Sequence, residues 1–306
     1  MREEKRVAAL LALAGGVLAI SWSAIFVRWA KMPGAASAFY RTLIATFVLW
    51  PLLPFAGRVS RPVTRRTFWI AMAGGVFFAG DLGFWNVAVM HTSAGNATFL
   101  SNISPLFVGL FIWMFTRTLP TLRFWIALIV GLAGSCLIVA ADLHHALSRS
   151  RADFLAVLAA ICFALYLVIT GLLREKCDAA MLLTLSTTAS AVTLLIFAVG
   201  ARVPLAVPGV GSWWALLWLG LVCQVGGYFG LTYALGHLPT TVTSILWLTI
   251  APLTSIFAWM IFGERMGAME IAGGLLILAG VWIVGRREKA APIEAAVEAI
   301  PPVAQV

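Results

Sequence analysis

The sequence contains little charge for its length. Asp, Glu, Lys and Arg together make up 11% of its 306 residues, whereas about 25% is usual for a soluble domain. Apolar residues of the set AVILMFWYC already reach 62% before the 27 glycines are counted, and a soluble fold has no interior large enough to bury that fraction. The net charge of +9 is scattered over short loops, so the composition excludes both a soluble fold and a nucleic-acid-binding protein.

Cysteine is scarce as well. The four cysteines are Cys136, Cys162, Cys177 and Cys223, and no two of them have C-x-x-C spacing. This pattern indicates neither a disulfide framework nor a metal site. We therefore expect the cysteines to be small packing residues, and we expect no cofactor and no bound metal.

Long apolar runs dominate what is present. A helix that crosses a bilayer needs about 20 predominantly apolar residues. Ten runs of about that length are separated by short breaks; the predicted spans are 7–27, 36–55, 68–89, 96–115, 123–141, 154–172, 180–200, 213–234, 241–262 and 268–285. The first run is longer than the apolar core of a signal peptide, which has about 7–15 residues. The sequence therefore predicts an all-α polytopic membrane protein with ten transmembrane helices in contact with the lipid bilayer.

The basic residues indicate an orientation, because short cytoplasmic loops are enriched in Lys and Arg. If the N-terminus is cytoplasmic, segments on that side hold 14 of the 21 basic residues and the opposite side holds six, with Arg41 inside the second span. We therefore expect both termini in the cytoplasm. The tail at 289–306 is rich in Ala, Pro and Glu without helical periodicity, and we expect it to be disordered.

The two halves of the chain share a pattern. At an offset of 147 residues the aligned pairs are Gly80 with Gly227, Gly83 with Gly230, Asn102 with Thr249, Pro105 with Pro252 and Phe115 with Phe262. We predict a first repeat at 1–145 and a second at 146–288, each with five spans. Because five is odd, the second repeat must enter the membrane in the opposite orientation, an architecture typical of secondary transporters.

Several stretches resemble one known family. They are NVAVMHTSAGNATFLSNISPLF at 86–107, TYALGHLPTTVTSILWLTIAPL at 232–253, FGER at 262–265 and GGLLILAGVWIV in the last span. These stretches resemble the ten-helix EamA branch of the drug/metabolite transporter superfamily. The resemblance covers about residues 7–286 and implies two tandem EamA domains with transport activity. Among branch members, YddG-like exporters of aromatic and neutral amino acids are the most similar in general character.

Ionisable residues deep in a span are candidates for function. Asp81 is the only carboxylate near the centre of a predicted span. Two interpretations stay open: a site for a proton, a cation or a substrate ammonium group, or a carboxylate that only packs between helices. Arg41 lies near the outer end of the second span, where we expect its long side chain to extend to the membrane surface. A pair between Arg41 and Asp81 is the alternative, because their predicted depths are similar.

Proline occupies matching positions in the two repeats. Pro105 and Pro252 fall near the middle of the fourth and ninth spans, where each removes one backbone hydrogen bond. Matching interruptions in corresponding helices are an indicator of a transporter's binding site. The alternative is a passive kink whose free carbonyl is satisfied by a neighbouring Ser or Thr.

Glycines in the third and eighth spans predict close helix packing. Gly226 and Gly230 form a G-x-x-x-G motif, which is typical of helices in close contact. Hinge motion at the glycines and prolines is the alternative, and the candidate hinge positions are Gly80, Gly83, Pro105, Gly227, Gly230 and Pro252.

Polar and aromatic residues in several spans predict a central cavity for a small molecule, with apolar walls and a few polar groups. The candidate lining residues are Trp22, Asp81, Trp85, Asn86, Ser101, Asn102, Tyr166, Gln224, Tyr228, Tyr233, Trp247 and Thr249. The cavity offers no cluster of basic residues that would hold phosphate. We therefore predict a substrate that is small and amphipathic, above all a neutral or aromatic amino acid.

Other classes of function fit the sequence less well. An intramembrane protease needs two aspartates, a Ser with a His, or an H-E-x-x-H motif, and none of the four histidines lies near mid-span. A channel is expected to show a pore-loop or ring-forming motif. We expect a monomeric, non-enzymatic exporter of the inner membrane. Export or exchange of another class, such as a sugar derivative, a purine or a cationic drug, is the alternative.

The predicted topology can be tested by cysteine labelling in a variant that lacks the four native cysteines. Ser60→Cys lies in a break predicted to be cytoplasmic, so a membrane-impermeant thiol reagent is expected to leave it unlabelled in intact cells. Ser148→Cys lies in a break predicted on the opposite side and is expected to react. The reverse labelling pattern would contradict the ten-span orientation.

Overall fold

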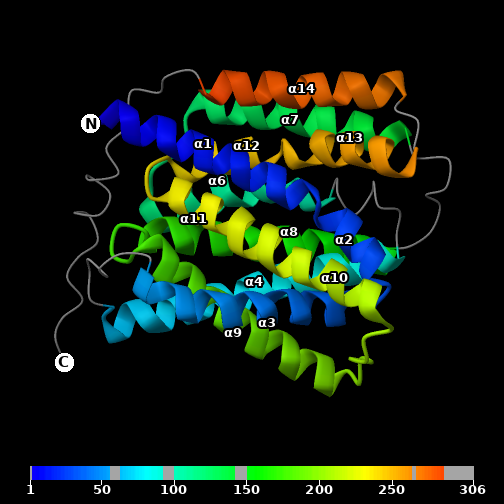
Figure 1. The fold of residues 1–306 in the computed structure, drawn as a ribbon. Helices are drawn as coiled ribbons and strands as arrows, with labels where there is room; N and C mark the ends of the chain where they lie inside the picture. Colours follow the sequence, from blue (N-terminus) through cyan, green and yellow to red (C-terminus); the bar gives the residue numbers. More distant parts are fainter. Residues whose placement is uncertain (1, 56–62, 92–99, 142–149, 264–266, 286–306) are drawn as a thin grey trace.

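The chain folds into an all-helical bundle (Figure 1). The computed structural model describes residues 2–55, 63–91, 100–141, 150–263 and 267–285. No strand occurs among these residues. The predicted disordered tail at 289–306 lies outside the described residues.

The first repeat contains α1 (Arg2–Ser21), α2 (Ser23–Ala30), α3 (Gly34–Leu52), the short 3-10 helix η1 (Leu53–Phe55), α4 (Arg65–His91), α6 (Ser104–Thr116) and α7 (Leu122–Ala141). The second contains α8 (Ser150–Leu173), α9 (Ala179–Gly200), α10 (Val210–Trp218), the π-helix η3 (Leu219–Gly227), α11 (Tyr228–Leu235), α12 (Thr240–Trp247), α13 (Ile250–Phe262) and α14 (Ala268–Gly285).

These helices confirm the predicted polytopic architecture. Eight stretches of the described chain are long and apolar enough to cross a membrane, and two further apolar helices are shorter. The first span is α1 with α2, and the fourth ends in α6. The eighth combines α10, η3 and α11, and the ninth combines α12 and α13. The outer surface carries large apolar side chains such as Phe47, Ile196 and Met260, as lipid contact requires.

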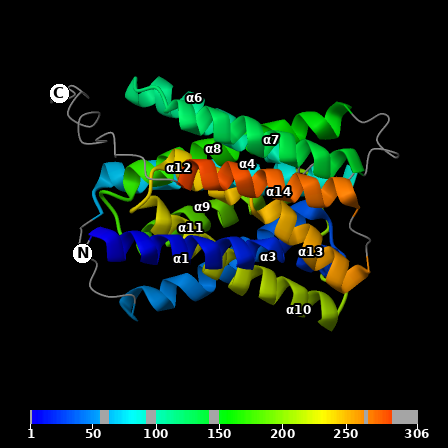
Figure 2. The same ribbon diagram turned by 90° about the horizontal axis from the view of Figure 1, so that it is seen from above.

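The first and last spans end on the same face of the bundle. Arg6 in α1 donates a hydrogen bond to the carbonyl oxygen of Gly285 at the end of α14, at 3.5 Å. In Figures 1 and 2 both helix ends lie at the left of the bundle. We call this side the terminal face and the opposite side the far face. An even number of crossings places both ends together.

The contact between α7 and α14 shows the symmetry that relates the two repeats. A Cβ atom at Gly134 would lie 2.5 Å from the carbonyl oxygen of Gly273, and one at Gly280 would lie 2.8 Å from that of Ala127. An offset of 146 residues converts one pair into the other, with the partners exchanged. The two helices therefore run antiparallel about a pseudo-two-fold axis, as inverted repeats require.

A second pair of contacts obeys the same relation. A Cβ atom at Gly16 in α1 would lie 2.6 Å from the carbonyl oxygen of Gly227. Gly80, which aligns with Gly227, lies against α8, where its Cβ atom would be 2.9 Å from the Sγ atom of Cys162. The first span thus packs on the eighth and the third on the sixth. Each of these contacts joins one repeat to the other, so the repeats interlock rather than stand apart.

The helices are interrupted near mid-span in three places within the described chain. The first span breaks at Trp22, the fourth at residues 102–103 and the ninth at residues 248–249. Pro105 lies in the first turn of α6, and Pro252 is the third residue of α13. Proline is tolerated in a first turn because the N–H groups there have no intrahelical partner. Each helix therefore ends just before its proline and restarts, instead of bending through it.

The predicted G-x-x-x-G contact is wrong in one respect. Gly226 is exposed, and a Cβ atom there would meet only the carbonyl oxygen of Leu221, at 3.7 Å. The packing glycines are Gly227 and Gly230, which face α1. The reason is local geometry: η3 is a π-helix, whose i→i+5 hydrogen bonds change which residues share a face.

Adjacent glycines in α1 provide a matched test of this packing. Gly16→Ala is expected to lower the stability of the detergent-solubilised protein by roughly 1–3 kcal/mol, because the added methyl group meets backbone atoms of the eighth span that have no room to move. Gly15→Ala is the control, since a Cβ atom there would meet nothing within 4 Å. The comparison is made by thermal unfolding, and equal midpoints for the two variants would contradict the close contact.

Candidate functional site

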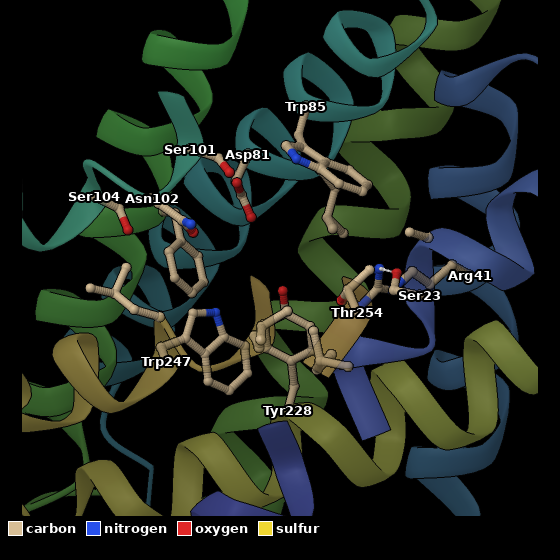
Figure 3. A pocket seen from close by; sticks show the side chains of 16 residues that line it. Ser23, Arg41, Asp81, Trp85, Ser101, Asn102, Ser104, Tyr228, Trp247 and Thr254 are labelled. Atoms are coloured by element: carbon tan, nitrogen blue, oxygen red, sulfur yellow. Dashed lines mark hydrogen bonds between the residues drawn. The ribbon is translucent and has the colours of Figure 1, made fainter. Parts of the chain in front are cut away.

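One cavity lies where the three helix breaks meet (Figure 3). Residues flanking the breaks contribute much of its lining: Ile20, Ser23, Ala24, Ser101, Asn102, Ser104, Trp247, Leu248 and Ile250. The remaining lining residues are Arg41, Asp81, Leu82, Trp85, Phe163, Tyr228 and Thr254. Both repeats therefore build the cavity, and the unwound backbone faces it rather than lipid, as the hydrogen-bonding needs of a membrane protein demand.

The polar lining lies in the central and far parts of the bundle. Arg41 is seven residues from the far-face end of α3, and Asp81 is ten residues from the far-face end of α4. At 1.5 Å per residue these separations are roughly 10 and 15 Å. Because a hydrocarbon core is about 30 Å thick, both groups are well below the membrane surface.

Arg41 is held inside the protein. Its side chain is 3% exposed, its Nε atom donates a hydrogen bond to Oε1 of Gln224 at 2.8 Å, and its Nη1 atom donates one to Oγ of Ser23 at 3.0 Å. The guanidinium also lies over the ring of Tyr228, 5.4 Å from its centroid. The expectation that this side chain extends to the membrane surface is therefore wrong, because partners from the eighth span and the first break hold it in the interior.

Asp81 reaches the same cavity from α4, beside Ser101 (Figure 3). Its carboxylate forms no hydrogen bond with another described residue, and no ion pair within 4.0 Å joins it to Arg41. The direct pair between these residues, which was the alternative interpretation of Arg41, is thus absent among the described contacts. The cavity instead contains one guanidinium group and one carboxyl group that face the same space.

A cluster of aromatic rings closes the cavity toward the terminal face. We call Phe78, Phe163, Tyr166, Tyr228 and Trp247 the aromatic floor. Ring centroids lie 4.5 Å apart for Phe78 and Tyr166, 4.6 Å for Phe78 and Tyr228, and 5.7 Å for Tyr228 and Trp247. The last three floor residues are each seven residues from the terminal-face end of their span, or roughly 10 Å. The floor therefore separates the cavity from that face.

Six of the residues predicted from the sequence line the cavity: Asp81, Trp85, Ser101, Asn102, Tyr228 and Trp247. The structure places the other predicted residues outside the lining, where each has a packing or hydrogen-bonding partner. Those residues are Trp22, Asn86, Tyr166, Gln224, Tyr233 and Thr249.

The partners explain why these side chains are not in the lining. Trp22 stacks on Phe257, with ring centroids 4.6 Å apart. The Nδ2 atom of Asn86 donates a hydrogen bond to the carbonyl oxygen of Leu82 at 2.6 Å. Thr249 donates one to the carbonyl oxygen of Leu246, also at 2.6 Å, and so satisfies a backbone group at the ninth-span break.

Tyr166, Gln224 and Tyr233 are placed by other contacts. Tyr166 belongs to the aromatic floor and is fully buried. Gln224 lies outside the lining and accepts a hydrogen bond from Arg41, while the ring of Tyr233 lies 4.5 Å from that of His237. Gln224 thus affects the cavity through the arginine and not by contact.

Sequence reasoning missed several lining residues, chiefly Ser23, Arg41, Ser104, Phe163 and Thr254. Thr254 donates a hydrogen bond to the carbonyl oxygen of Ser21 at 3.1 Å, which satisfies a backbone group at the break of the first span. In the sequence Thr254 follows Pro252 by two residues, and Ser104 directly precedes Pro105. Proximity to a predicted break was therefore a usable signal for Thr254 and for Ser104.

Among the described residues, no group of three His, Cys, Asp or Glu side chains comes together that would hold a metal ion. The architecture defines the class of protein: a ten-helix membrane protein of two inverted repeats with a cavity at the helix breaks. The chain belongs to the EamA-like transporter family, whose model matches residues 7–140 and again 150–286. It is a transporter-family protein and not a member of an enzyme family.

Individual relatives are distant but extend over most of the chain. The pseudopaline exporter CntI of Pseudomonas aeruginosa (strain UCBPP-PA14) is 25% identical over 271 residues, which cover 85% of this chain and 89% of the relative. A probable terminal-alkyne amino-acid exporter of Streptantibioticus cattleyicolor is 25% identical over 229 residues, covering 75% and 76%. A crystal structure with 16% identity has the same fold, with a TM-score of 0.76 over 91% of this chain and 97% of that one.

Gln224 provides a test of how Arg41 is held. Gln224→Leu is expected to reduce stability by about 1–3 kcal/mol, because it leaves the buried Nε donor of Arg41 without an acceptor. Gln224→Glu is the matched variant, since it keeps an oxygen acceptor in nearly the same place and is expected to unfold close to the wild-type temperature. Thermal unfolding in detergent measures both, and an unchanged midpoint for the leucine variant would contradict this role.

Proposed function

We propose that this protein exports small amphipathic metabolites, chiefly neutral and aromatic amino acids, by alternating access of the central cavity. The observation that carries the proposal is that helix breaks from both repeats converge on one cavity. Discontinuous helices that meet near the bilayer centre are the usual form of a secondary transporter's substrate site. We further propose that the protein lies in the inner membrane with both termini in the cytoplasm. We also propose that the monomer is the transport unit.

The chemistry of the lining supports this substrate class. Trp85, Phe163 and Trp247 provide large aromatic surfaces, and Ser104 and Thr254 provide neutral hydroxyl groups. Small-molecule sites typically combine apolar walls with a few placed polar groups. A single arginine does not match a ligand with several phosphate or carboxylate groups, which needs clustered basic residues. Two relatives are named as exporters, one of them of an amino acid.

Alternating access requires the aromatic floor to open and the far side of the cavity to close. The ninth span is the least buried of the eight long spans, and in α13 only Ala251 is buried. Segments with few buried contacts have the lowest cost of local rearrangement. We propose that α6, α12 and α13 move about the breaks beside Pro105 and Pro252. Four glycines lie where neighbouring helices are in close contact: Gly80, Gly83, Gly227 and Gly230. We propose that they permit the helices to slide past one another.

Transport in proteoliposomes tests the proposal. The purified protein is expected to move phenylalanine, leucine and alanine. Trp85→Leu and Trp247→Leu are expected to slow transport of phenylalanine by roughly tenfold and that of alanine much less, because the lost aromatic contact is with the side chain of the substrate. The measurement is the initial rate of radiolabelled uptake for each amino acid.

Trp218→Leu serves as the matched control, because Trp218 is 48% exposed and lies outside the lining. It is expected to leave the phenylalanine-to-alanine ratio unchanged. If the protein moves sugar phosphates or nucleotide sugars but no amino acid, the proposed substrate is wrong. An equal loss for small and large amino acids in both cavity variants would contradict the proposed contact with the side chain.

A further inference from the structure

The charges in the cavity are arranged in an unusual way for a membrane interior. Burying an ionised group without a partner is costly, and opposite charges in one site normally pair. Here Arg41 and Asp81 both line the cavity, yet no ion pair within 4.0 Å joins them. They enter from different helices, α3 and α4, and line the same cavity (Figure 3). The pair is therefore split by a gap that a ligand can fill.

Arg41 is fixed in position, but one of its three nitrogen atoms has no hydrogen-bond partner among the described residues. Gln224 and Ser23 accept hydrogen bonds from Nε and Nη1, and the ring of Tyr228 lies against the guanidinium. The Nη2 atom is buried and has no hydrogen-bond partner among the described residues. A buried donor without an acceptor is destabilising. A carboxylate oxygen is the acceptor that a guanidinium binds most strongly.

Asp81 offers the complementary feature. Its carboxylate is partly buried and makes no hydrogen bond to another described side chain or backbone group. An ammonium group supplies three donors and a positive charge, so it satisfies a carboxylate that water reaches poorly. The aromatic rings of Trp85 and Tyr228 beside this space also favour a cation.

We propose that Arg41 and Asp81 together bind a zwitterion, with the ligand's carboxylate at Nη2 of Arg41 and its ammonium group at Asp81. The proposal rests on the proposed transport function, but it concerns the charged ends of the ligand and not its side chain. A ligand with only a positive charge would meet Arg41, and one with only a negative charge would meet Asp81. The cavity thus selects against singly charged molecules of the same size.

Binding to the purified protein tests the two contacts separately. The probes are phenylalanine, phenylalaninamide, which lacks the carboxylate, and N-acetylphenylalanine, which lacks the ammonium group. Isothermal titration is expected to show that each modified probe binds wild-type protein roughly tenfold or more weakly than phenylalanine, because hydrogen bonds to charged groups are strong. Because all three probes are compared on the wild-type protein, the result does not depend on whether a variant folds.

Asp81→Asn assigns the ammonium contact. Within this variant, phenylalanine and N-acetylphenylalanine are expected to have similar affinities, because the ammonium contact is lost for both. Phenylalaninamide is expected to bind more weakly than phenylalanine, because it also lacks the carboxylate that Arg41 binds. Asp178→Asn is the matched control, because Asp178 lies at the N-cap position of α9 outside the cavity and its neutralisation is expected to leave all three affinities unchanged. If Asp81→Asn weakens the three probes equally, the assigned contact is wrong.

Taurine and glycine betaine separate this inference from the proposed function. Both are zwitterions without an aromatic side chain. If phenylalanine, phenylalaninamide and N-acetylphenylalanine bind equally well to wild-type protein, the zwitterion site is wrong and amino-acid transport stands. If the protein binds taurine or betaine but no amino acid, the zwitterion site stands and the proposed substrate is wrong. If it binds none of these zwitterions, both are wrong.

Discussion

Hydrocarbon offers no hydrogen-bond partner to a peptide group, and this constraint organises the whole molecule. A break in a helix is tolerable in a membrane only where protein or a polar cavity satisfies the freed groups. Each mid-span break of the described chain meets that condition at the central cavity. Thr254 satisfies the carbonyl of Ser21, and Thr249 satisfies that of Leu246. The irregular backbone and the cavity therefore lie at the same place, because the cavity supplies the polar groups that the freed backbone needs.

The sequence predicted what depends on position along a helix and missed what depends on neighbours. Hydropathy located the spans, and proline located the breaks in the fourth and ninth, because both signals are local. Arg41 was misplaced because its burial depends on Gln224, 183 residues away. Gly226 was predicted to pack in the eighth span, whereas Gly227 packs instead. The prediction assumed 3.6 residues per turn, and a π-helix does not follow that periodicity. Half of the predicted lining faces neighbours instead of the cavity for the same reason: lateral direction is set by packing.

The two repeats share a fold but not a chemistry. The offset of 147 residues that aligns Gly80 with Gly227 also aligns Asp81 with Tyr228. Both residues line the cavity, so one structural position supplies a charge in the first repeat and an aromatic ring with a hydroxyl group in the second. Arg41 also belongs to the first repeat. The order of the spans and the breaks in the fourth and ninth follow the repeat, whereas Arg41 and Asp81 both come from the first repeat.

The interlocked glycine contacts have a consequence for biogenesis. The most extensive helix contacts in the described chain join α7 to α14, α4 to α8 and α9, α3 to α9, and α1 to α11, and every one crosses from one repeat to the other. Gly16, Gly80 and Gly134 all contact partners that are synthesised later. The first five helices can be inserted as they leave the ribosome, but their mutual surfaces stay incomplete until the second repeat arrives. Assembly is therefore completed only after the second repeat is synthesised, and a truncated chain leaves the helix surfaces that contact this repeat exposed.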